Sequence, residues 1–154
     1  MIIGPASPRD AGEILTVQHA AYVTEAQLYD DPHIVPLNDT LDDVRAAIVA
    51  GQALVARDGS RVVGAVRGVV DGDVCTVARL VVAPDMRGRG IGSALLAAVE
   101  AREAGRVERF VLFTGHRSAG NLRLYRGAGY VDTHVVAVTD TLSLVHLEKT
   151  PVRG

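Results

Sequence analysis

The sequence predicts a mixed α/β domain, with a central sheet of antiparallel and parallel strands flanked by helices. Short apolar runs bounded by Gly, Asp and Pro indicate strands, and longer segments rich in Ala, Leu and Glu indicate helices. Three strand-length runs separated by Asp-Gly pairs occur in the middle of the chain, and strands alternating with helices follow them. The 154 residues suit a single domain spanning residues 1–154.

The N-terminal third is predicted to contain one strand and two helices. Ser7 is a typical N-cap and Pro8 suits the first helical position, so a helix is expected to begin there. Val23-Thr24 is a potential break in this helix. Thr40 caps the second helix, and Gly51 marks its end. In chain order the expected elements are a strand over 1–6, a helix over 8–28, a loop over 30–38 and a helix over 42–50.

The rest of the chain is predicted to begin as an antiparallel meander, because Asp58-Gly59 and Asp71-Gly72 are typical hairpin turns. A helix then crosses over from the third strand of the meander to the next strand, which makes those two strands parallel. The expected elements are strands over 52–57, 61–70 and 74–82, a helix over 90–104, a strand over 110–114, a helix over 119–127, and a hairpin over 131–138 and 142–147.

Composition excludes several classes of protein. A net charge of −2 gives no reason to expect a nucleic acid or a membrane as partner. The N-terminus lacks signal-peptide character, and no apolar run is long enough to span a membrane. The single cysteine, Cys75, is expected to be a buried apolar residue of a cytoplasmic protein. The five histidines show no metal-ligand spacing, so no metal is expected.

The glycine-rich run Arg87-Gly88-Arg89-Gly90-Ile91-Gly92 joins the apolar strand over 74–82 to the helix over 90–104. Glycines at alternate positions let the backbone approach a ligand closely. The first N–H groups of a helix have no partner within it, and they lie at the positive end of the helix dipole. The run therefore predicts a site for phosphate or pyrophosphate.

Two common phosphate-binding motifs do not fit this run. A P-loop has a lysine followed by Ser or Thr after its last glycine, whereas Ser93 follows Gly92 with no lysine between them. A dinucleotide fingerprint has glycine at its sixth position, where a count from Gly88 reaches Ser93. It also has an acidic residue at the end of the next strand, but Glu108 precedes that strand.

The run resembles the acetyl-CoA motif of the GNAT N-acetyltransferase superfamily, Arg/Gln-x-x-Gly-x-Gly/Ala, which Arg87, Gly90 and Gly92 match. Downstream, Asn121-Leu122-Arg123-Leu124-Tyr125-Arg126-Gly127-Ala128-Gly129-Tyr130 is similar to a second family segment, with Asn and Tyr four residues apart before Gly-Phe/Tyr. The order of elements matches as well. The resemblance covers nearly the whole chain and implies a GNAT-like fold, with a V-shaped split between the fourth and fifth strands.

The resemblance further implies that acetyl-CoA, as acyl donor, binds in this split. The pantetheine arm would pair with the backbone of the strand over 74–82, and the pyrophosphate would bind the amides of the glycine run, with added charge from Arg87 and Arg89. The implied cofactor-binding residues are Leu80, Val81, Val82, Arg87, Gly88, Arg89, Gly90, Ile91, Gly92, Ser93, Asn121, Leu124 and Tyr125.

Tyr125 is the implied catalytic acid, because the family's tyrosine at this position protonates the departing thiolate. Proton transfer from a phenol of pKa about 10 to a thiolate, whose thiol has a pKa of about 8.5, is uphill by roughly 2 kcal/mol. A protonated amine acceptor must also lose a proton. Glu25 is the best candidate for this base by residue type and position, with Tyr22 beside it as a substrate-binding residue. The alternative for Glu25 is an exposed helix charge.

The expected function is direct transfer of an acetyl group to a primary amine in a ternary complex, with a small molecule as acceptor. Glu25, Asp30, Asp31 and Asp39 could form an acidic lip that favours a cationic amine, or a solvated loop. Two alternatives stay open: a protein or peptide amine as acceptor, and an acyl-CoA-binding regulatory module without turnover. A homodimer is a further expectation, since dimers are common in the resembled family.

Overall fold

The computed structural model describes residues 1–31 and 34–152; Pro32 and His33 of the predicted loop lie outside the described residues. One seven-stranded sheet has the order β1-β2-β3-β4-β5-β7-β6. Neighbours are antiparallel except β4 and β5, which run parallel, as the crossover predicts. The strands are β1 (Ile2–Pro5), β2 (Ala53–Asp58), β3 (Arg61–Asp71), β4 (Val74–Val82), β5 (Arg109–Gly115), β6 (Val131–Ala137) and β7 (Ser143–Lys149).

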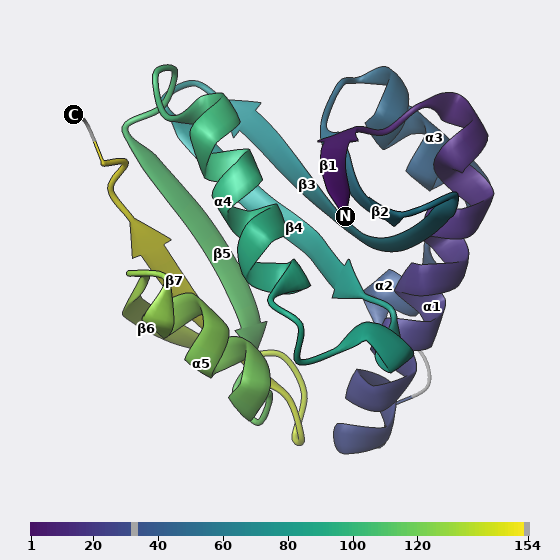
Figure 1. Cartoon of the computed structure of the whole chain (residues 1–154). Helices are drawn as coiled ribbons and strands as arrows, with labels where there is room; N and C mark the ends of the chain where they lie inside the picture. Colours follow the sequence, from purple (N-terminus) through teal and green to yellow (C-terminus); the bar gives the residue numbers. More distant parts are fainter. Residues whose placement is uncertain (32–33, 153–154) are drawn as a thin grey trace.

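Helices pack on both faces of this sheet (Figure 1). α4 packs on β2, β3 and β4 from one side, whereas α1 packs on β3, β4 and α3. The alternation of β3 separates the two faces: Gly64 and Gly68 face α4, and Arg67 between them contacts Asp39 on the α1 side. The α-helices are α1 (Ala11–Leu28), α2 (Val35–Asn38), α3 (Leu41–Val49), α4 (Ile91–Glu103) and α5 (Ala119–Gly127).

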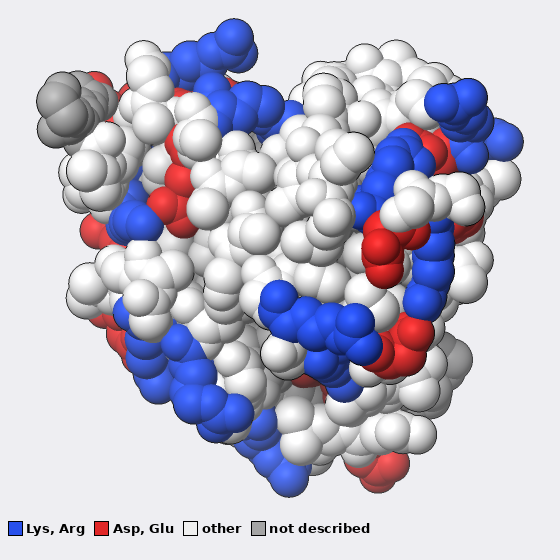
Figure 2. Space-filling model, in the orientation of Figure 1, with Lys and Arg blue, Asp and Glu red and all other residues white. Residues whose placement is uncertain are grey.

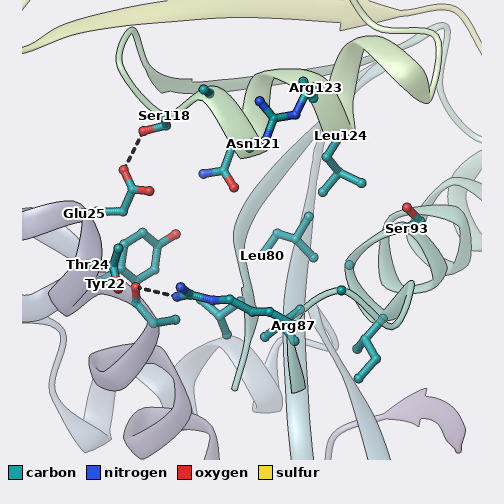
Figure 3. A pocket seen from close by; sticks show the side chains of 18 of the residues that line it. Tyr22, Thr24, Glu25, Leu80, Arg87, Ser93, Ser118, Asn121, Arg123 and Leu124 are labelled. Atoms are coloured by element: carbon teal, nitrogen blue, oxygen red, sulfur yellow. Dashed lines mark hydrogen bonds between the residues drawn. The ribbon is translucent and has the colours of Figure 1, made fainter. Parts of the chain in front are cut away.

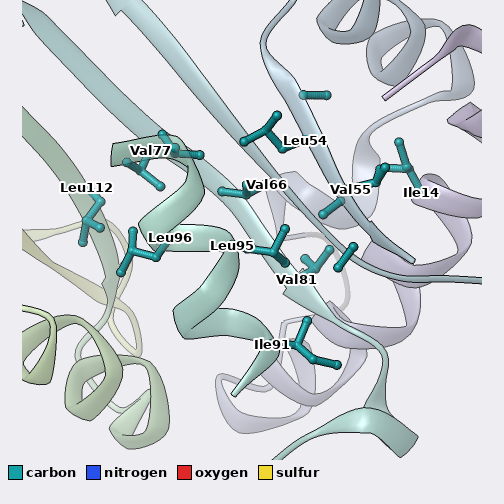
Figure 4. Packing of buried hydrophobic residues seen from close by; sticks show 14 of the residues in the cluster. Ile14, Leu54, Val55, Val66, Val77, Val81, Ile91, Leu95, Leu96 and Leu112 are labelled. Carbon is teal, nitrogen blue, oxygen red and sulfur yellow. The ribbon is translucent and has the colours of Figure 1, made fainter. Parts of the chain in front are cut away.

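Close packing of α4 depends on the two glycines of β3. A Cβ on Gly64 would lie 2.9 Å from Leu95 Cδ1, and one on Gly68 would lie 2.9 Å from Val99 Cγ1. Leu95 and Val99 are fully buried, and Figure 4 shows Leu95 between the neighbouring side chains of the sheet. This packing holds the N-terminal end of α4, and so the glycine-rich run, in a defined place relative to β4.

Three details of the predicted elements are wrong. α1 continues through Val23-Thr24, because both side chains are exposed and the helix is held by buried residues on its other side. A short helix, α2, lies within the predicted loop, with a proline in its first turn. The hairpin turns are Gly59-Ser60 and Gly72-Asp73, one residue later than predicted. Each has positive φ only at its glycine, the pattern of a type II′ turn.

Candidate active site

A split opens where β4 and β5 stop pairing. Within the described residues, these strands pair only over Val74–Thr76 and Arg109–Val111. Beyond that point β5 continues beside β7, and β4 bends away (Figure 1). The V-shaped split between the fourth and fifth strands is therefore confirmed.

A β-bulge in β4 accompanies this separation. Ala65 pairs with Val81 and Arg67 pairs with Ala78, so Arg79 and Leu80 together oppose the one residue between them on β3. Arg79 has φ 53°, a left-handed conformation that is costly for a residue with a side chain. Such a bulge bends its strand and increases its twist. The extra residue also reverses which side chains face α4.

This reversal places apolar side chains of β4 at the split. Before the bulge, Cys75 lies on the α4 face, close to Gly68 and Val99. After the bulge, Val82 pairs with Gly64 and faces α4, and Leu80 lines the split. Figure 3 shows Leu80 near the centre of the opening. A strand without the extra residue would present the opposite set of side chains there.

The split contains a cavity of about 780 Å³. Its walls come from α1, the end of β4, the glycine-rich run, and the start of α5, so segments far apart in sequence meet around one space. Every predicted site residue lines it except Arg89 and Tyr125. The lining residues that were predicted are Tyr22, Glu25, Leu80, Val81, Val82, Arg87, Gly88, Gly90, Ile91, Gly92, Ser93, Asn121 and Leu124.

The glycine-rich run lines this cavity where α4 begins. Gly88 and Gly90 have φ of 77° and 79°, so two of the three glycines are needed for their left-handed conformation. Gly90 is the N-cap of α4, and Ala94 N donates the first hydrogen bond back to its carbonyl. The amides before Ala94 therefore lack this partner, and the first turn carries no acidic residue. This end of α4 suits an anion.

Arginines surround the opening although the chain is slightly acidic overall. Figure 2 shows Lys and Arg side chains over α5 and over the loop before α4, on either side of an uncharged groove. Arg87, Arg117 and Arg123 line the cavity, and Arg89 is exposed outside it. Arg87 reaches across the opening, with Nη2 at 3.5 Å from the Ala21 carbonyl of α1. A net charge of −2 gave no sign of this cationic rim.

Asn121 and Tyr125 lie on α5 but have different surroundings. Asn121 lines the cavity, and its Nδ2 donates to Thr114 Oγ1 at the end of β5. Tyr125 is buried behind the lining, with its ring packed edge-on against Tyr130. Burial raises the pKa of Tyr125, and the nearby Tyr22 and Glu25 raise it further. Its hydroxyl is therefore protonated throughout the neutral range.

On the other side of the split, α1 carries the predicted acceptor residues. Tyr22 and Glu25 are both half-buried, and Figure 3 shows them facing Leu80 and Asn121 across the space. Burial raises the pKa of Tyr22 to about 12, so this hydroxyl is also protonated. Glu25 Oε2 accepts a hydrogen bond of 2.5 Å from Ser118 Oγ. Glu25 is thus held at the cavity, not exposed on the helix surface.

The acidic lip is corrected by the structure. Of its four predicted members, Glu25 lines the cavity. Asp39 lies instead on the α1 side of the sheet, where its carboxylate accepts hydrogen bonds from Gln18, Arg67 and Arg79. Burial works against ionisation there, but the bonds from Arg79 and Gln18 and the two arginine charges hold the pKa of Asp39 below its usual range. Asp39 therefore clamps the bulge.

A family model describes most of this chain. The acetyltransferase (GNAT) family matches residues 23–130, which include the split strands, the glycine-rich run and α5. The chain belongs to the GNAT acetyltransferase family. No curated protein sequence matches it significantly.

Solved GNAT structures share its whole fold. A putative acetyltransferase from Salmonella typhimurium, yncA, solved with acetyl-CoA, is 22% identical with a TM-score of 0.78, covering 100% of this chain and 95% of that one. An N-acetyltransferase from Staphylococcus aureus is 17% identical with a TM-score of 0.82, covering 98% of each chain. The PaiA N-acetyltransferase from Thermoplasma acidophilum, solved with coenzyme A, is 16% identical with a TM-score of 0.76, covering 97% and 98%.

Several lining residues of this GNAT domain escaped sequence reasoning. Ser118 and Arg117 precede α5, and nothing near them in sequence indicates that α1 packs opposite. Thr24 and Leu28 were not predicted either, because their place at the cavity depends on how α1 packs in the folded protein. The unpredicted lining residues are Ala21, Thr24, Leu28, Met86, Arg117, Ser118, Ala119, Gly120 and Arg123.

Cys75 lies away from the cavity lining. Its thiol is fully buried, and burial, with a smaller effect of Glu103, raises its pKa to about 11. A thiol with this pKa is protonated and unreactive at neutral pH, which confirms Cys75 as a buried apolar residue. Among the described residues, no cluster of three or more His, Cys, Asp or Glu side chains could hold a metal ion, and no helix is long and apolar enough to cross a membrane.

Proposed function

We propose that this GNAT acetyltransferase moves an acetyl group from acetyl-CoA to the primary amine of a small molecule by direct transfer in a ternary complex. One observation carries the proposal: residues of the glycine-rich run and Glu25 line the same cavity. The first group suits the anionic donor, and the second suits a protonated amine. Donor and acceptor can then meet without a covalent enzyme intermediate.

Each residue has a defined part in the proposed reaction. Glu25 takes a proton from the ammonium, and the amine nitrogen attacks the thioester carbonyl. The edge of β4 that β5 leaves unpaired binds the donor arm and polarises this carbonyl. The C–S bond then breaks as the C–N bond is completed, and the sulfur receives a proton from Tyr125. The nitrogen releases its second proton, which restores the tyrosine through solvent, and Glu25 releases the first proton to solvent.

The raised pKa of Tyr125 affects the last of these steps. With ordinary pKa values, proton transfer from a phenol to a thiolate is uphill by roughly 2 kcal/mol. Burial of Tyr125 increases this cost in the ligand-free protein. Tyr125 therefore acts first as a hydrogen-bond donor that stabilises the developing negative charge on sulfur, and full transfer follows as the bond breaks.

The test is release of free thiol from acetyl-CoA across a panel of primary amines: spermidine, tyramine, glucosamine, lysine, and peptides with a free N-terminal alanine or an internal lysine. We expect turnover with at least one small amine, and a loss of roughly hundredfold in kcat for Tyr125→Phe and for Glu25→Gln. Tyr130→Phe is the matched control, since it removes a hydroxyl from an equally buried ring that bonds Glu100 instead.

The outcomes separate the alternatives. Turnover of the peptides alone makes the acceptor a protein amine. Tight binding of acetyl-CoA without thiol release from any amine makes the chain a binding module. We also propose that the protein acts in the cytoplasm without a metal, a nucleic acid or a membrane, and as a homodimer; sedimentation analysis tests the last of these.

A further inference from the structure

We infer that Ser118 and Tyr29 are positioning residues that hold Glu25 in the geometry for proton transfer. The inference rests on the proposed function, in which Glu25 is the base. Ser118 is the residue before α5, and Tyr29 is the residue after α1. The two therefore join the acceptor side of the split to the helix that carries Asn121 and Tyr125.

The hydrogen bonds form a chain with a defined direction. The Arg117 backbone N–H donates to Tyr29 Oη at 2.8 Å. Tyr29 Oη and Ser118 Oγ are 2.9 Å apart, and Ser118 Oγ is 2.5 Å from Glu25 Oε2. Ser118 Oγ donates its single hydrogen to Glu25 Oε2, so the Tyr29 hydroxyl must donate to Ser118. Every donor in this chain points toward Glu25.

Ser118 makes this contact in place of the capping hydrogen bond that is usual at its position. A serine at a helix N-cap normally accepts a hydrogen bond from an amide of the first turn, which stabilises the helix. Ser118 is the N-cap of α5, yet its side chain makes no capping bond in the described structure. Its hydroxyl is directed instead across the split to α1. A side chain diverted in this way from local stabilisation is typical of a functional site.

Tyr29 is closely packed in its position. Both Tyr29 and Ser118 are almost fully buried, at 3% and 4% exposed. Gly115, the last residue of β5, provides the room: a Cβ there would lie 2.0 Å from Tyr29 Oη and 2.5 Å from Cζ. The φ of Gly115 is not in the left-handed region, so this contact, not backbone conformation, is what requires glycine.

The chain of hydrogen bonds leaves one oxygen of the Glu25 carboxylate for the acceptor. Oε2 is occupied by Ser118, and Figure 3 shows the second oxygen directed into the cavity, toward Leu80 and Asn121. A carboxylate held at one oxygen by a buried donor cannot rotate freely, so the other oxygen keeps one direction. Proton transfer depends strongly on such alignment. The same bonds fix α1 against α5, and so set the base relative to Tyr125.

The experiment measures kcat and KM for Ser118→Ala and Tyr29→Phe with acetyl-CoA and the amine turned over fastest in the panel above. Both changes only delete atoms. We expect kcat to fall about three- to tenfold, since misplacement of a reacting group by 1 Å can cost up to about a hundredfold. The KM for acetyl-CoA should stay unchanged, and Tyr130→Phe should keep the wild-type kcat. Each change is also made in the Glu25→Gln background.

A double-mutant cycle separates positioning from simple support of the fold. If Ser118 and Tyr29 act through Glu25, their deletion costs nothing further in kcat once Glu25 is Gln. If both changes lower kcat as much in the Glu25→Gln background as in the wild type, or if they behave as Tyr130→Phe does, the inference is wrong while the proposed function stands. If Glu25→Gln itself leaves kcat unchanged, or no amine is acetylated, the proposed function fails and the inference with it.

Discussion

Replacing Asp39 by Asn should destabilise the protein and weaken donor binding together. Asp39 links the end of α2 to the bulge in β4, where it accepts from Arg79 Nε at 3.0 Å and from Arg67 Nη2 at 3.3 Å. Asn keeps the shape but removes the charge. It leaves the Arg67 and Arg79 guanidinium groups without a counter-charge, and it weakens the contacts around the bulge, where Arg79 has φ 53°.

The size of the effect follows from burial. The side chains of Asp39, Arg67 and Arg79 are 11%, 16% and 21% exposed, so solvent screens them only partly. Removing one partner of a buried ion pair typically costs about 3–5 kcal/mol. Because Asn can still accept one of these hydrogen bonds, we expect about 3 kcal/mol. For a domain of this size, that corresponds to a fall in Tm of about 6–12 °C.

Thermal and urea unfolding measure the stability, and calorimetric titration with coenzyme A at low temperature measures donor affinity. Asp42→Asn is the matched control, because Asp42 is 95% exposed and only 3.8 Å from Arg45. It should cost about 0.5 kcal/mol or less. We expect Asp39→Asn to weaken coenzyme A binding several-fold, since a relaxed bulge closes the split. Equal Tm values for the two variants, or unchanged affinity in a destabilised Asp39→Asn, would refute the reasoning.

Three further predictions concern the same framework. Because the pKa of Asp39 is lowered in the folded protein, its contribution to stability is complete above its unfolded pKa of about 3.8 and is lost as the pH falls through the folded pKa. The difference in unfolding free energy between wild type and Asp39→Asn should therefore stay constant from pH 5 to 7 and shrink below pH 4. Arg87→Ala should weaken coenzyme A binding about tenfold by calorimetry and Arg89→Ala less than twofold, because of these two arginines Arg87 alone lines the cavity; equal losses would contradict that placement. Gly115→Ala should lower Tm by about 5 °C through overpacking against Tyr29, whereas Gly105→Ala, where a Cβ meets no atom within 4 Å, should change it little.

The local structure of the cavity wall proposed for the donor was predictable because its determinants are local. Gly88 and Gly90 are required by their own positive φ, and the amides of α4 follow directly from where that helix begins. The order of strands and helices was predictable for a similar reason, since apolar periodicity and turn residues act over a few positions. The errors in the elements were small. They arose where tertiary contacts override local preference, as in the continuous α1.

The rest of the cavity wall was only partly predictable, because pairs of residues distant in sequence hold it. Tyr29 and Ser118 are 89 positions apart, and Arg79 and Asp39 are 40 apart. The sequence around Asp39 does not show whether this residue lies at the acceptor opening or bonds the bulge of β4. The bulge left one faint sign: the alternation of Cys75 and Val77 changes to an unbroken apolar run at Leu80. That change of period is what an inserted residue produces.

This difference in construction has a consequence for function. In the proposed function the glycine-rich run binds the donor with backbone groups, so most side-chain substitutions nearby should leave donor binding intact. Side chains that bridge separate elements hold the rest of the cavity wall: Glu25 of α1 bonds Ser118 before α5, and Asp39 after α2 bonds Arg79 of β4. A substitution in α1 or α5 can therefore move the base or reshape the acceptor space while coenzyme A still binds. Changes of acceptor among variants of this chain should therefore arise at the bridge from Glu25 to Ser118, with donor affinity preserved, whereas substitution of Asp39 should weaken donor binding as well.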